Sequence, residues 1–220
     1  MSVVEYCDES VKLCALRVTA LNTDGSVAPE PNNSYVTDNT ISLAPTGDIQ
    51  VGVESTLVGG CGQIIATFKD QDRLKRFNLS LVLGTPDPAL TSMLLGGSLV
   101  LDTDVPIGMS WPINVCPTDT PPPPVAIEAW SYAWECDHQN PTSPYWYWSF
   151  PMCFFSPSNQ FTLGNDLLQL DWAGYTRSNP LWGHGPYGGS ILFEPQGGYA
   201  QVADAPPSAA CGFASVTPGS

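Results

Sequence analysis

The chain has 220 residues, 21 of them acidic and only seven basic, which gives a formal net charge of −14. Phosphate binding needs clustered lysine and arginine, so this balance argues against a protein that grips nucleic acid or an anionic membrane surface. Charged residues make up 13% of the chain, whereas proline (22) and glycine (20) are abundant and spread along it. Many short strands joined by turns have this composition, and we therefore expect an all-β protein.

The start of the chain, MSVVEYCDES, has acids but neither a basic region nor an apolar stretch, so we predict no signal peptide. We also find no apolar run near the ~18 residues that a membrane span needs. The seven cysteines are scattered without a CxxC pair, which argues against a zinc site. Most of them fit small buried side chains, while pairing of Cys7 with Cys14 or another partner stays open.

Residues 1–12 are predicted to form an N-terminal arm before a first strand at 13–21. A loop rich in Asp, Gly, Pro and Asn follows at 22–33. Alternating or β-branched runs predict six further strands, at 34–43, 48–57, 63–69, 74–83, 98–102 and 106–115. The strand at 74–83 has a period of two that places Phe77, Leu79, Leu81 and Leu83 on one buried face.

One short helix is predicted at about residues 87–95. Asp87 fits the N-cap and Pro88 the first helical position, and Gly96 with Gly97 marks the end. Its apolar stripe consists of Ala89, Leu90, Met93 and Leu94. A weaker helix candidate lies at 165–173.

The proline-rich stretch 117–124 (PTDTPPPP) predicts an extended polyproline conformation. We interpret it as a stiff crossing inside one domain of residues 1–220, rather than as a linker between two domains. Shorter strands are suggested at 160–163 and 190–193. The segment 195–220, mostly Gly, Ala, Pro and Ser, is predicted to be an extended C-terminal arm.

Two aromatic segments, 125–135 and 145–155, predict an antiparallel hairpin around a polar loop. In the second segment Trp146 and Trp148 share one face with Phe150, and tyrosines occupy the other face. Three interpretations remain open for these rings: core packing, contact with a neighbouring subunit, and stacking on sugars.

Four of the seven basic residues lie close together at the junction of the strands predicted at 63–69 and 74–83. This predicts a charged turn formed by Lys69, Asp70, Asp72, Arg73, Lys75 and Arg76. The turn is either a solvated set of salt bridges or a contact with acidic patches on an adjacent copy. We take these six residues, with Trp146 and Trp148, as candidate subunit-interface residues.

Catalytic chemistry has little support in the sequence. The two histidines, His138 and His184, lie in loops, and GxSxG, HExxH and phosphate-binding glycine loops are missing. Glu128 and Glu135 would point to opposite faces of one strand, which does not suit a pair of catalytic carboxylates. We therefore predict no enzyme, no catalytic or metal-binding residue and no cofactor.

The block Cys61–Gly97 reads CGQIIATFKDQDRLKRFNLSLVLGTPDPALTSMLLGG. It resembles the major tail protein, or tail tube protein, of long-tailed phages that infect actinobacteria. The upstream segment Cys14–Asn39 (CALRVTALNTDGSVAPEPNNSYVTDN) is similar to the N-terminal strand-turn-strand of that family. The resemblance covers roughly residues 14–97, less than half of the chain.

The resemblance implies a β-sandwich or half-barrel with the helix packed on it. It also implies hexameric rings that stack into a tube of the virion tail, assembled in the host cytoplasm without a membrane. Tape measure, tail terminator and tail tip proteins would be further partners, and DNA would pass through an acidic channel without specific binding. The alternative is a carbohydrate-binding β-sandwich module of a tail, decoration or cell-surface protein.

Overall fold

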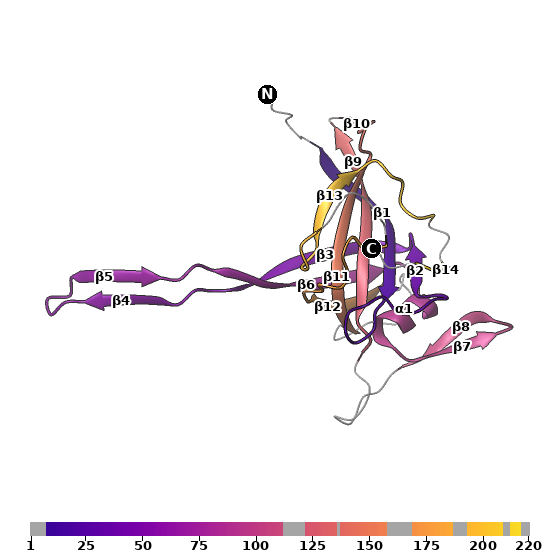
Figure 1. Cartoon of the computed structure of the whole chain (residues 1–220), viewed down its shortest axis with the longest axis horizontal. Helices are drawn as coiled ribbons and strands as arrows, with labels where there is room; N and C mark the ends of the chain where they lie inside the picture. Colours follow the sequence, from indigo (N-terminus) through magenta and orange to yellow (C-terminus); the bar gives the residue numbers. More distant parts are fainter. Residues whose placement is uncertain are drawn as a thin grey trace.

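A computed structural model describes residues 8–111, 122–135, 137–157, 169–186, 193–208 and 212–216. Within these ranges the all-β prediction is confirmed, with a single helix (Figure 1). The main strands are β1 (Glu9–Ala20), β2 (Ser34–Thr37), β3 (Thr40–Gln50), β6 (Arg73–Leu83), β9 (Val125–Glu135), β11 (Tyr145–Pro157) and β12 (Leu170–Thr176). Four shorter strands are β4 (Glu54–Val58), β5 (Ile64–Lys69), β7 (Ser98–Asp102) and β8 (Val105–Ser110). The last three, β10 (His138–Gln139), β13 (Gly198–Val202) and β14 (Gly212–Ala214), each join the main sheet at one neighbour.

Ten of the described strands build one antiparallel sheet. Eight of them follow the order β14-β2-β1-β9-β11-β12-β6-β3, while β10 pairs with β9 and β13 pairs with β11 beside this path. The sheet curls until β3 comes close to β1 again, so that it forms a half-barrel (Figure 1). We refer to this half-barrel with its helix as the body. Two separate two-stranded ribbons, β4-β5 and β7-β8, leave the body.

The core lies inside the curl of the sheet. The period of two in β6 is confirmed, because Leu79, Leu81 and Leu83 are buried against Ile127 and Trp172. Burying a large apolar side chain contributes about 1.5–3 kcal/mol to the free energy of folding. Burial of this cluster therefore determines which side of each core strand points into the curl of the sheet.

The predicted helix is confirmed as α1 (Pro88–Leu95). The Asp87 side chain caps it by accepting a hydrogen bond from the Leu90 amide, 3.1 Å away. Gly96 ends it at a φ of 77°, a conformation that glycine adopts without steric cost. Buried Leu90 and Leu94 fasten the helix to the core.

The aromatic hairpin is also confirmed, since β9 pairs with β11 in an antiparallel register. Tyr147 lies opposite Trp130 on one face, and their ring centroids are 5.3 Å apart. Trp146 and Trp148 project from the other face.

Several sequence-based boundaries need correction. β1 begins at Glu9, inside the segment predicted as an arm, and the weak helix candidate at 165–173 ends in strand β12. The C-terminal segment is not simply an extended arm, because β13 pairs with β11 and β14 pairs with β2. The polar pair Asp38 and Asn39 divides the predicted strand 34–43 into two.

Other sequence-based predictions fall mostly on residues that the structure leaves undescribed. Residues 1–7, 112–121, the strand predicted at 160–163 and all but the last residue of the one at 190–193 lie outside the described ranges.

Candidate assembly surface

A long two-stranded arm projects from one side of the body (Figure 1). We define the arm as residues 48–76, which comprise the outer ends of β3 and β6 together with all of β4 and β5. β5 pairs with β4, and β6 pairs with β3. The charged turn predicted here between the two strands therefore needs correction, because Lys69–Arg73 does not fold β5 back on β6. That segment lies midway along one edge of the arm.

The real turn of the arm is at Gly59–Gly62, which the sequence marks with three glycines in four residues. The Gly59 amide donates to the Gln63 carbonyl at 2.8 Å, and Gly62 has a φ of 77°. A three-residue hairpin loop often ends with glycine in this left-handed region. Residues 70–73 (DQDR) contain neither glycine nor proline, and this difference was the signal that could have located the turn.

The arm changes direction at a joint between its inner and outer halves. The β3-β6 pairing stops at Gln50 and Arg73, and the β4-β5 pairing starts at Glu54 and Lys69. Between them the Asp72 side chain accepts a hydrogen bond from the Gly52 amide at 2.9 Å. The two segments of the arm approach so closely here that a Cβ on Gly52 would lie 2.0 Å from the Asp70 carbonyl oxygen.

Next to the joint, the outer half of the arm has one mainly apolar and one polar face, and the exposed apolar side chains of Val58, Ile64 and Ile65 follow near its turn. Ser55 lies opposite Phe68 and Leu57 opposite Ala66, so the side chains of these four residues share a face. The opposite face carries the pairs Glu54–Lys69 and Thr56–Thr67. Phe68 is 62% exposed and Leu57 is 60% exposed. Contiguous exposed apolar surface commonly marks a site of interaction with another molecule.

The six charged interface candidates all lie on the arm, where the side chains of three of them make contacts within the chain. Arg76 pairs with Asp48 at 2.9 Å and lies 5.0 Å from the Tyr175 ring centroid. Lys69 is 4.0 Å from Asp72. Asp70, Arg73 and Lys75 are exposed. The structure thus supports part of the salt-bridge interpretation and leaves Arg73 and Lys75 accessible to a second molecule.

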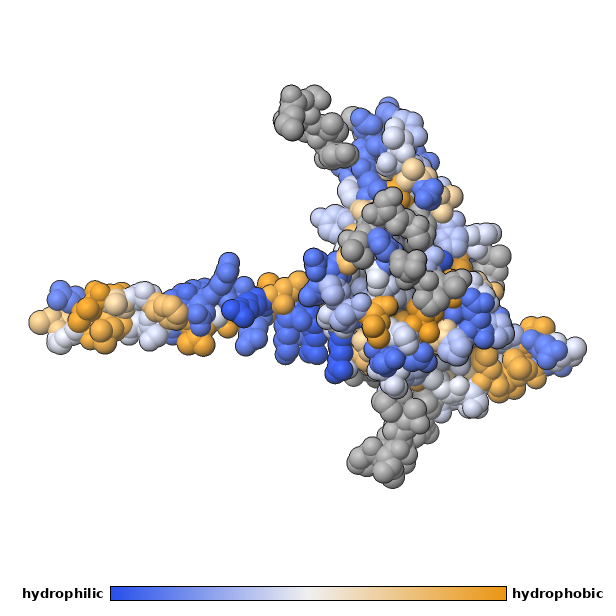
Figure 2. Space-filling view, in the orientation of Figure 1, coloured by the Kyte–Doolittle hydropathy of each residue, from blue (hydrophilic) through white to orange (hydrophobic). Residues whose placement is uncertain are grey.

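Charge is divided unevenly between the arm and the rest of the chain. The arm holds four of the seven bases and four of the 21 acids, so it is neutral and the remainder carries the whole net charge of −14. Orange apolar and blue polar patches alternate along the arm (Figure 2). Without the arm, two copies of the body would repel each other.

The other two interface candidates, Trp146 and Trp148, are half-buried on the body and do not meet the charged cluster. Trp148 stacks on Tyr199 of β13 at a centroid distance of 4.7 Å, and Trp146 lies 5.9 Å from the same ring. Tyr199 itself is 61% exposed. Core packing and an accessible aromatic surface therefore coexist in this part of the sheet.

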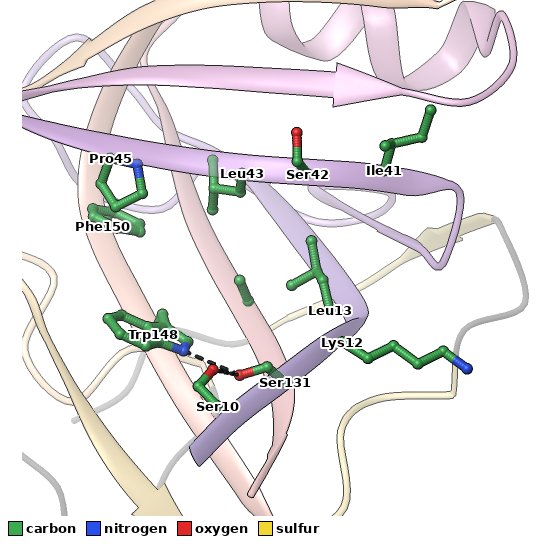
Figure 3. Close-up of a pocket in the computed structure, with 11 residues that line it drawn as sticks. Ser10, Lys12, Leu13, Ile41, Ser42, Leu43, Pro45, Ser131, Trp148 and Phe150 are labelled. Atoms are coloured by element: carbon green, nitrogen blue, oxygen red, sulfur yellow. Dashed lines mark hydrogen bonds between the residues drawn. The ribbon is translucent and has the colours of Figure 1, made fainter.

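A cavity of about 420 Å³ opens beside this surface, where β3 approaches β1 (Figure 3). Leu13, Leu43 and Trp148 line it, whereas the Lys12 side chain extends away from it (Figure 3). Three of its polar groups bond to one another, since the Ser10 and Ser131 hydroxyls are 2.6 Å apart and Trp148 donates to Ser131 at 3.3 Å. The cavity is thus a mainly apolar opening into the core.

A buried ion pair crosses the aromatic sheet, and sequence reasoning missed it. Arg17 donates to both carboxylate oxygens of Glu128 at 2.6 and 2.8 Å, and the Tyr147 hydroxyl donates to Glu128 at 2.8 Å. Burial, followed by the adjacent Glu128 charge, raises the pKa of Tyr147 well above its usual value. All polar atoms of Glu128 thus have structural partners.

The described residues contain no group of three or more His, Cys, Asp and Glu side chains that could hold a metal ion. Of the three described cysteines, Cys153 is buried, Cys14 is half-buried and Cys61 is exposed at the tip of the arm. The buried interpretation therefore fails for Cys61. The described helix has eight residues, too few to cross a membrane.

Comparison with known proteins adds no identification. No protein-family model matches the chain, and no curated protein matches it significantly.

Proposed function

We propose that this protein is a structural subunit of the tail tube of a long-tailed phage and that it polymerises through its arm. The arm is the observation that carries the proposal. It displays an apolar face that no described residue of its own chain covers, on a ribbon whose outer strands pair only with each other. Burial of this face against another copy would supply the association energy at ~25 cal/mol per Å² of apolar area.

The charge distribution supports the same function. The neutral arm can approach the acidic body of a neighbour, while the body keeps a surface that repels phosphate. In a tube of stacked rings, a lumen lined by acidic bodies would let DNA slide without binding. The resemblance of residues 14–97 to the tail tube family adds independent support.

The experiment is negative-stain electron microscopy of the purified chain at increasing concentration. We expect rings or hollow tubes. The double variant Leu57→Asn with Phe68→Asn should abolish them, because it removes the apolar face of the arm.

The matched control places the same residue on the polar face, as Thr56→Asn with Thr67→Asn, and should assemble like the wild type. Circular dichroism would show that both variants keep the fold. A wild-type chain that stays monomeric up to the highest soluble concentration would contradict the proposal.

A second candidate function, carbohydrate binding, is favoured by the exposed ring of Tyr199 stacked on Trp148 beside the cavity. Exposed aromatic rings provide flat apolar faces on which a sugar can stack. Tryptophan fluorescence titration with neutral oligosaccharides tests this function. A saturable change that Tyr199→Ala abolishes, in a chain that forms no tubes, would favour this candidate over the first.

A further inference from the structure

We propose that the arm of one copy docks on the β7-β8 hairpin of the next copy, so that assembly proceeds head to tail. This inference rests on the proposed function and names the receptor for the arm. The β7-β8 hairpin, residues 98–110, is the second ribbon that leaves the body.

The β7-β8 hairpin matches the arm in its exposed apolar surface. Val105 is 59% exposed and Ile107 is 62% exposed on β8, where the pairing with β7 shifts register between Pro106 and Gly108. On β7, Val100 and Leu101 are also exposed. At its base the hairpin is anchored, because β8 packs on α1 and Trp111 lies 6.2 Å from Trp172. The receptor is thus a fixed apolar surface.

Both ribbons also have unpaired strand edges among the described residues. β4 pairs only with β5 there, and β7 pairs only with β8. Backbone amides and carbonyls along such edges can bind a further strand, which is a common way for two chains to join. Edge pairing would set the register, and the apolar faces would supply the affinity.

Charge complementarity supports this receptor. The β7-β8 hairpin carries Asp102 and Asp104 at its tip and no basic residue. The arm has Arg73 and Lys75 exposed near its joint. Opposite charges at the two ends of the contact would align the ribbons and would oppose pairing of two arms or of two hairpins.

The arm and the β7-β8 hairpin project from opposite sides of the body (Figure 1). Because the body separates them, the arm of a copy cannot reach the hairpin of the same copy. A contact between two different surfaces is heterologous, and it continues from copy to copy until a ring closes or a filament grows. The proposed contact therefore leads to rings or tubes and excludes a simple twofold dimer.

The test is a complementation experiment with two assembly-defective variants of the full chain. The first variant, Leu57→Asn with Phe68→Asn, loses the apolar arm face and keeps the receptor. The second variant, Val105→Asn with Ile107→Asn, loses the receptor and keeps the arm. Each should be monomeric alone in analytical ultracentrifugation. Mixed in equal amounts, they should form a heterodimer, because one intact arm then meets one intact receptor.

A control on the hairpin, Ser110→Asn, should assemble like the wild type. If the second variant still forms tubes, the receptor lies elsewhere and the inference is wrong, although the proposed function stands. If the second variant forms dimers by itself, the arms pair with each other and the inference is again wrong. A wild-type chain that never assembles would instead overturn the proposed function.

Discussion

At the scale of single residues, the buried cluster of Arg17, Glu128 and Tyr147 joins three strands of the sheet. Glu128 is fully buried, and a buried carboxylate is tolerated because a bidentate arginine and a hydroxyl satisfy it. Arg17 also lies 5.5 Å from the centroid of the Trp130 ring. These contacts tie β1, β9 and β11 together on the face opposite Trp146 and Trp148.

The raised pKa of Tyr147 predicts a pH dependence of stability. An unfolded tyrosine loses its proton near pH 10, whereas folded Tyr147 keeps it. Deprotonation therefore stabilises the unfolded state, and the free energy of unfolding falls as the pH rises above 10. The stabilising contribution is complete below pH 10 and disappears as the pH rises through the folded pKa. The Tyr147→Phe variant loses its hydrogen bond to Glu128 and should be less stable than the wild type by about 1–2 kcal/mol at pH 8.

The difference in the free energy of unfolding between the two proteins should be about 1 kcal/mol smaller at pH 11. The wild type loses stability there, whereas phenylalanine has no proton to lose. Urea unfolding of both proteins at the two pH values measures this difference. A difference that stays constant would show that Tyr147 ionises normally in the folded protein.

At the scale of elements, local signals were reliable where a residue acts on its immediate neighbours. Asp87 caps α1 and additionally accepts a hydrogen bond from the Tyr35 hydroxyl at 2.7 Å, which links the helix to β2. The period of two in β6 likewise reported a real core face. The charged segment Lys69–Arg73 was misjudged because β5 pairs with β4 and β6 pairs with β3, and only the glycines at 59–62 mark the turn between these pairs.

Removal of the helix cap should therefore lower stability measurably. We expect Asp87→Ala to reduce the free energy of unfolding by roughly 1–2 kcal/mol, because the Leu90 amide loses its acceptor. Tyr35→Phe removes only the second hydrogen bond and should have a smaller effect. Urea denaturation monitored by circular dichroism compares the two variants with the wild type. Equal effects would show that the cap itself contributes little.

At the scale of the whole molecule, the body and the arm have separate roles. The core lies entirely in the body, and the outer arm strands pair only with each other within the described residues. Stability and assembly should therefore be separable. The structure assigns the first to the half-barrel, and we assign the second to the arm and its receptor.

Excision of residues 51–72, which make up most of the arm, tests this separation. Gln50 and Arg73 are direct cross-strand partners, so residues 51–72 can be replaced by Asn-Gly, a two-residue hairpin turn. We expect the shortened chain to unfold within about 2 °C of the wild type, because less than 1 kcal/mol of core stability is lost. It should form no tubes. A large fall in the unfolding temperature would show that the arm stabilises the body.

The sequence by itself determined the all-β class, the helix with its two ends, the aromatic hairpin and the concentration of bases between residues 69 and 76. These features depend on alternation, capping and composition, which act over a few residues. Only the tertiary structure decided that this segment lies along a projecting arm, that Glu128 is neutralised by Arg17, and that the C-terminal segment supplies strands to the sheet. Each of these depends on pairing between distant residues, because strand partners are chosen by the packing of the whole sheet.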